Sequence, residues 1–154
     1  MKNIKVTALF YWLSAVFYLL NAAMLLVMPF VPLFPIAANR KYTLIVGLTF
    51  WITLALAIAA IVLAIISRRK FKKANPKAYN ASDCRWGVIT FFSNVIAIIF
   101  DLMFVVAAFA LCIMLMLGRF KGYFAFVVLF MLVLSLSMHC LFNGRVFKTI
   151  KHNI

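Results

Sequence analysis

The chain has 154 residues, of which 68% are hydrophobic, and its formal net charge is +14. Only 12% of the residues are charged, about half the share of an ordinary soluble domain, which excludes a conventional soluble fold. The sixteen Lys and Arg residues gather between long apolar stretches, as in juxtamembrane segments, so nucleic-acid binding is not expected. The composition predicts an all-α, polytopic membrane protein, a bundle of four transmembrane helices in a single domain, 1–154.

The first predicted span, residues 6–28, follows a short basic segment. It is longer than the apolar core of a signal peptide and long enough to cross a bilayer, so we interpret it as a retained helix. Four polar residues recur in it at spacings of three, four and three, which places them on one helical face. They are Tyr11, Ser14, Tyr18 and Asn21. Pro29, Pro32 and Pro35 end this helix, and their apolar connector is expected to cap the bundle.

The second predicted span, residues 43–67, carries small residues at spacings of three and four, which form one smooth face. They are Thr49, Thr53, Ala57, Ala60 and Ala64. Small residues let two helix backbones approach closely in lipid, where packing drives helix association. We therefore expect this span to be the most deeply packed helix of the protein.

A basic segment, residues 68–85, follows the second span and is predicted to be a cytoplasmic loop. Five of its first six residues are bases: Arg68, Arg69, Lys70, Lys72 and Lys73. Each base near an anionic leaflet gains roughly 1 kcal/mol, so contact with anionic lipid headgroups is one interpretation. The other is a signal that only orients the neighbouring spans.

The third predicted span, residues 87–116, holds the carboxylate of Asp101 near its middle, and Asn94 lies seven residues earlier. A charge at the centre of the hydrocarbon core costs roughly 2.5–3.5 kcal/mol on insertion scales. None of the predicted spans contains Lys or Arg, so the pattern favours either a protonated Asp101 or a partner outside this chain.

The fourth predicted span, residues 123–143, follows a tight turn at Gly118–Gly122 that makes the last two spans antiparallel neighbours. Asn143 and Gly144 are expected to end this helix. His139 lies close to that end, about 5 Å above the inner boundary of a 30 Å hydrocarbon core, and is interpreted as an interfacial histidine at a different depth from Asp101.

Basic residues are distributed unequally between the two sides of the predicted bundle. Twelve bases lie in the two termini and in the segment 68–85, whereas four lie in the two opposite connections. Basic residues accumulate on the cytoplasmic side of membrane proteins, so both termini are predicted to be cytoplasmic.

The polar residues of the spans suggest one intramembrane polar seam. At 1.5 Å per residue, Asn21 and Asp101 each lie about 22 Å from the inner ends of their spans, and Ser14 and Asn94 each lie about 12 Å from them. Our hypothesis is that the first, second and third spans form this seam, with Tyr18, Thr49 and Thr53 contributing. Three roles stay open for it: hydrogen-bonded helix packing, docking of a partner subunit, and binding of a proton or cation.

Catalytic motifs are missing from the sequence. It has no Gly-rich phosphate loop and no HExxH, and its three cysteines, Cys84, Cys112 and Cys140, lack metal or disulfide spacing and are interpreted as small apolar residues. We expect no cofactor and no metal. The sequence favours a non-enzymatic accessory, assembly or regulatory subunit that acts with another membrane protein or with itself. The alternative is a small proton- or cation-coupled transporter or channel that uses Asp101.

Overall fold

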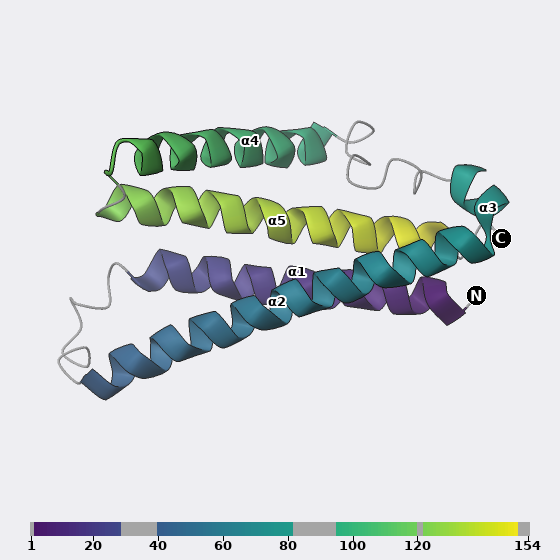
Figure 1. The fold of residues 1–154 in the computed structure, drawn as a ribbon, viewed down its shortest axis with the longest axis horizontal. Helices are drawn as coiled ribbons and strands as arrows, with labels where there is room; N and C mark the ends of the chain where they lie inside the picture. The colour runs from purple at the N-terminus through teal and green to yellow at the C-terminus, as the bar shows by residue number, and fades with distance from the viewer. Residues whose placement is uncertain (1, 29–39, 82–94, 120–121, 151–154) are drawn as a thin grey trace.

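The structure is a computed structural model in which residues 2–28, 40–81, 95–119 and 122–150 are described (Figure 1). These residues are almost entirely helical, which confirms the predicted all-α class. The elements are α1 (Lys2–Val27), α2 (Arg40–Ala74), the short α3 (Pro76–Ala81), α4 (Val95–Met116) and α5 (Tyr123–Ile150). The connector with the three prolines, for which a capping role is predicted, lies outside the described residues.

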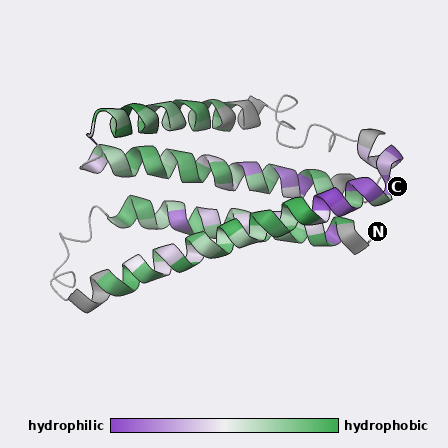
Figure 2. Cartoon of the chain, in the orientation of Figure 1, coloured by the Kyte–Doolittle hydropathy of each residue, from purple (hydrophilic) through white to green (hydrophobic). Residues whose placement is uncertain are grey.

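Three helices, α1, α2 and α5, are long and apolar enough to cross a bilayer, as expected for a membrane protein (Figure 2). The fourth long helix, α4, contains a shorter apolar stretch, Leu102–Met116. Its 22 residues rise about 33 Å, close to the thickness of a hydrocarbon core.

The four long helices form an open bundle with α1 and α5 at its centre. Helix α1 packs against both α5 and α2, and α4 packs against α5. At the left of Figure 1 the helices follow in the order α4, α5, α1, α2, and at the right α2 crosses α1 toward the end of α5. Because α2 and α4 lie at opposite edges, these two helices share no comparable contact along their described residues.

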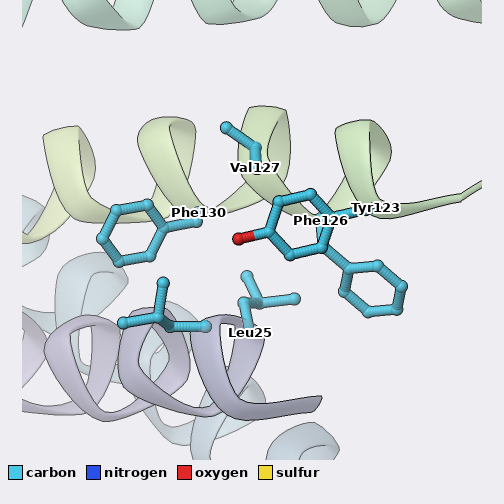
Figure 3. Close-up of a pocket in the computed structure, with 6 residues that line it drawn as sticks. Leu25, Tyr123, Phe126, Val127 and Phe130 are labelled. Atoms are coloured by element: carbon cyan, nitrogen blue, oxygen red, sulfur yellow. The ribbon is translucent and has the colours of Figure 1, made fainter. Parts of the chain in front are cut away.

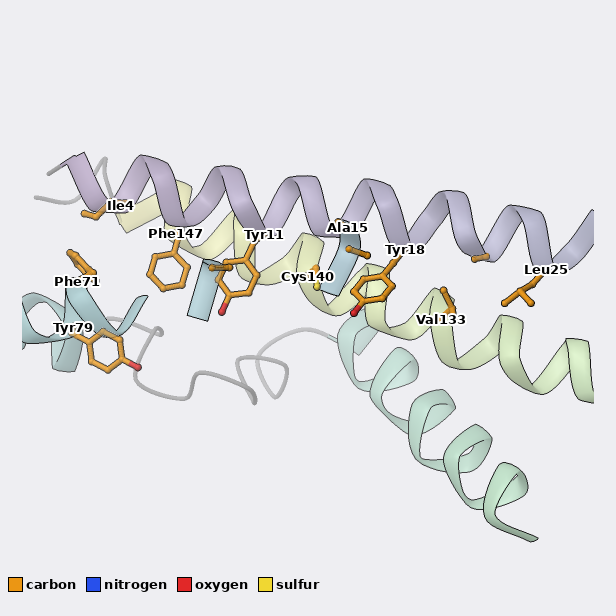
Figure 4. Packing of buried hydrophobic residues seen from close by; sticks show 13 residues of the cluster. Ile4, Tyr11, Ala15, Tyr18, Leu25, Phe71, Tyr79, Val133, Cys140 and Phe147 are labelled. Carbon is orange, nitrogen blue, oxygen red and sulfur yellow. The ribbon is translucent and has the colours of Figure 1, made fainter. Parts of the chain in front are cut away.

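The main core lies where α1 meets its two neighbours (Figure 4). Helix α1 contributes the largest share of its buried residues: Ile4, Tyr11, Ala15, Tyr18, Ala22 and Leu25. A smaller cluster joins α4 to α5 through Ala107, Met114, Ala125 and Val128. Apolar side chains elsewhere on the helices are largely exposed, as is normal where lipid is the solvent.

The prediction that the second span is the most deeply packed is wrong. Of the most apolar 18 residues of α2, 17% are buried, whereas 39% are buried in the corresponding stretch of α1. Ala57, Ala60 and Ala64 are buried as small contact residues, but Thr49 is exposed. The physical reason is the order of the helices, because α2 packs mainly against α1 and meets α5 near its C-terminal end, through Phe71 and Phe147.

The ends of two helices differ from the sequence prediction. Helix α5 continues through Asn143 and Gly144 to Ile150, so the predicted stop is wrong. Gly144 instead permits a close approach, since a Cβ atom there would lie 2.8 Å from Cδ1 of Trp12. Helix α2 continues beyond residue 67 and carries the basic residues as far as Ala74. The turn before α5 is as predicted, with positive φ angles at Gly118 (61°) and Gly122 (80°).

Candidate functional site

Three polar residues of α1 recur every seven residues and are fully buried: Thr7, Ser14 and Asn21. A spacing of seven is nearly two helical turns, so the three side chains lie along one stripe that faces the packed neighbours. Near the start of the stripe, the Thr7 hydroxyl shares a hydrogen bond with the hydroxyl of Ser67 on α2.

Two more hydrogen bonds continue this stripe along α2. The Ser14 hydroxyl donates to the main-chain oxygen of Ala57 at 3.0 Å. Further along, the Thr53 hydroxyl lies 3.2 Å from Oδ1 of Asn21, to which it can donate, and it also lies close to main-chain oxygens of its own helix. The Asn21 amide nitrogen donates to the main-chain oxygen of Phe17. Helices α1 and α2 are thus joined by side-chain hydrogen bonds at three levels.

Helix α5 supplies the other side of the seam. The Ser137 hydroxyl donates to the main-chain oxygen of Ala15 at 2.7 Å, and the Cys140 thiol donates to the Ser14 hydroxyl at a sulfur–oxygen distance of 3.6 Å. Every buried side-chain nitrogen and oxygen atom in the described part of the chain has a hydrogen-bond partner. We call this hydrogen-bonded contact of α1 with α2 and α5 the polar seam.

The composition of the polar seam differs from the sequence hypothesis. Tyr18 is buried in the adjoining core, whereas the Thr49 hydroxyl donates to Ile45 within α2. Sequence reasoning missed Thr7, Ser67, Ser137 and Cys140 as members. Thr7 could have been found from its spacing of seven from Ser14. Ser67, Ser137 and Cys140 lie on faces that only the packing of the helices defines.

The predicted contribution of Asn94 and Asp101 to the seam stays a prediction, because neither side chain is among those described. The structure places α5, not α4, against α1, because the tight turn makes α4 a neighbour of α5 and the serines and the cysteine of α5 fit α1. Asn94 lies outside the described residues. Asp101 lies in α4, but only its backbone is described.

The heights of Asp101 and His139 follow from the turn that joins their helices. Asp101 lies fifteen residues before the end of α4 at Met116, and His139 lies sixteen residues after the start of α5 at Tyr123. At 1.5 Å per residue, both backbone positions lie about 22–24 Å from the turn. Counted from the turn, the two positions are therefore level, whereas the prediction counts the height of Asp101 from residue 86, which lies outside the described residues.

No protein-family model, curated protein or solved structure matches the chain.

The basic end of the bundle is organised around Tyr79 of α3. Nη2 of Arg68 donates to the Tyr79 hydroxyl at 2.8 Å. The guanidinium carbon of Arg68 and Nζ of Lys72 lie 5.8 Å and 5.3 Å from the centroid of the Tyr79 ring, both within the range of cation–π attraction. Two of the five predicted lipid-contact bases therefore share one aromatic ring, a feature that sequence reasoning missed.

An aromatic chain connects this end to the core. The Tyr79 ring lies 6.4 Å from the ring of Phe71, which lies 6.2 Å from that of Phe147, and Phe147 stacks on Tyr11 at 5.8 Å. All four rings are buried (Figure 4). The other three predicted lipid-contact bases, Arg69, Lys70 and Lys73, are exposed along the same part of α2.

A groove of about 210 Å³ lies at the opposite end, between α1 and α5 (Figure 3). It is lined by Leu25, Leu26, Tyr123, Phe126, Val127 and Phe130. Apart from the Tyr123 hydroxyl, its side chains are apolar, so it offers no acid–base pair or nucleophile. Across the described residues, no three His, Cys, Asp or Glu side chains are grouped to hold a metal ion.

Proposed function

We propose that this protein is a non-enzymatic accessory, assembly or regulatory subunit that acts beside a larger membrane protein or as a homo-oligomer. The open bundle is the observation that carries the proposal. Among the described residues, helix α4 packs on α5 through a small apolar cluster, and α2 packs mainly on α1, with a ring contact between its Phe71 and Phe147 of α5 near the basic end. A closed four-helix bundle would pair these edge helices with each other.

The edge helix α4 has the features of a helix that docks. It brings an ionisable residue, Asp101, into an otherwise apolar segment. Ionisable residues within membrane helices commonly pair with a group on another helix, because hydrocarbon does not solvate them. A partner helix with a polar or basic residue would complete the environment of α4, and a second copy of the chain would do so through its own polar groups.

The proposed topology has four crossings of the cell membrane with both termini in the cytoplasm. The start of α1, the end of α5 and the junction of α2 with α3 lie at one end of the bundle (Figure 1). Exposed bases of α1, α2 and α5 gather there, among them Lys5, Lys73 and Arg145. This charge distribution supports a cytoplasmic location for that end.

The deciding experiment is the mass and composition of the complex extracted in mild detergent at native expression level. We expect a different membrane protein at fixed stoichiometry, or a homo-oligomer of fixed size, and Asp101→Leu is expected to release the partner chain. A chain that runs as a monomer in every mild detergent tested would overturn the proposal.

One observation favours the alternative of a proton- or cation-coupled transporter. The backbone positions of Asp101 and His139 lie at nearly the same height on two packed helices, and acidic residues and histidines within membrane helices occur in proton pathways. In liposomes, such a protein would give a pH-dependent flux that Asp101→Asn abolishes. No flux above that of protein-free liposomes would exclude this alternative and leave the accessory role.

A further inference from the structure

The basic end of α2 is a structured surface rather than a set of independent charges. The aromatic ring of Tyr79 is 4% exposed, and its contact with Phe71 ties it to the bundle core. Arg68 and Lys72 both lie against this ring, and Arg68 is also held by its hydrogen bond to the tyrosine hydroxyl. Their positions are thus set by the folded core, whereas a signal that only orients a span needs charge without fixed geometry.

This surface carries a large excess of positive charge. Its segment 68–81 contains six bases and no acid, so no pairing within it can neutralise these charges. Arg and Lys side chains are donors that suit a phosphate group. The charge and the donors therefore fit an anionic phosphate.

The same side of α2 continues as an apolar stripe toward the bundle centre. Ile58, Ile65 and Lys72 recur every seven residues, with Arg68 between the last two. Ile58 and Ile65 are exposed at 48% and 40%. The 35 residues of α2 span about 52 Å, well beyond a hydrocarbon core of about 30 Å, so α2 is long enough to hold the stripe within the hydrocarbon and the bases at headgroup level.

We propose that Arg68 and Lys72, positioned by Tyr79, bind the phosphate of an anionic phospholipid whose acyl chain lies along Ile65 and Ile58. The apolar stripe beside the bases is the reason for choosing a lipid rather than a soluble phosphate. Buried Tyr79 holds the two bases in place rather than contacting the lipid itself.

The test measures which lipids stay bound to the protein. The protein is reconstituted in nanodiscs of equimolar phosphatidylglycerol and phosphatidylcholine, released into mild detergent, and analysed by native mass spectrometry. We expect the wild-type chain to retain phosphatidylglycerol preferentially. Lys72→Gln is expected to lower this preference about five-fold, and Arg68→Gln with Lys72→Gln about 30-fold. Lys72 is exposed, so its replacement leaves the core intact.

The matched control removes two bases from the opposite connection, with Arg119→Gln and Lys121→Gln together. This control is expected to keep the wild-type lipid preference. Equal retention of both lipids by the wild-type chain, or an equal loss of preference in the control, would overturn the proposal. A second measurement compares the lipid with free inorganic phosphate at matched ionic strength. If phosphate raised the melting temperature of the protein in phosphatidylcholine as much as phosphatidylglycerol does, the ligand would be a free anion, and the lipid proposal would be overturned.

Discussion

Gly144 allows α5 to approach α1 closely, and its replacement by alanine tests the packing of these central helices. A Cβ atom at position 144 would lie 2.8 Å from Cδ1 and 2.9 Å from Nε1 of Trp12. Carbon atoms pack at about 3.5–4.0 Å, so either the rigid indole ring or the helix must shift. Overpacking of this kind typically costs about 1–3 kcal/mol.

An opposing effect must be subtracted from this cost. Alanine in the interior of a helix is more favourable than glycine by roughly 0.5–1 kcal/mol. We therefore expect Gly144→Ala to lower the free energy of unfolding by about 1 kcal/mol, and by less where the ring of Trp12, 39% exposed, can turn outward. The measurement is reversible unfolding in mixed detergent–SDS micelles, followed by the helical circular dichroism signal.

The chain offers a matched control in Gly47, which lies inside α2, where a Cβ atom would have nothing within 4 Å of it. Gly47→Ala is expected to be neutral or to stabilise by up to about 1 kcal/mol. In a Trp12→Leu background, Gly144→Ala should lose its cost because the ring is gone. Equal stability of the two alanine variants in the wild-type background would refute the close contact between α1 and α5.

Three further predictions concern the seam, the aromatic chain and the edge helix. Thr53→Val removes the hydroxyl near Asn21 at nearly constant volume and should lower stability by about 0.6 kcal/mol, measured by the same SDS titration; no change would mean that this hydrogen bond does not join the helices. Phe147→Ala removes a buried ring and should lower the free energy of unfolding by about 3–5 kcal/mol. It should also speed tryptic cleavage around Tyr79, and an unchanged cleavage rate would show that α3 does not depend on the aromatic chain. If a protonated Asp101 docks the partner, Asp101→Asn should leave the mass of the complex unchanged, because the amide keeps a neutral hydrogen-bonding group. Loss of the complex would show that the negative charge itself is needed.

Much of the local structure follows from the sequence, since its causes are local. Hydrophobic length predicts the helices, and glycine alone readily adopts the positive φ angles found at Gly118 and Gly122. The spacing of Tyr11, Ser14, Tyr18 and Asn21 predicts one face of α1, and the structure buries all four. These features need only the period of a helix and the conformational limits of each residue type.

The contacts between helices were decided by the tertiary structure. A stripe of small or polar residues indicates which face of a helix packs, but several helices here carry such a stripe, and spacing alone does not pair them. The pairing of α1 with α5 depends on surfaces that meet across more than a hundred residues, as when Ser137 reaches Ala15. That pairing placed α2 and α4 at the edges and made Gly144 a contact residue rather than a helix stop, because helix order and register are properties of matched surfaces and not of any single segment.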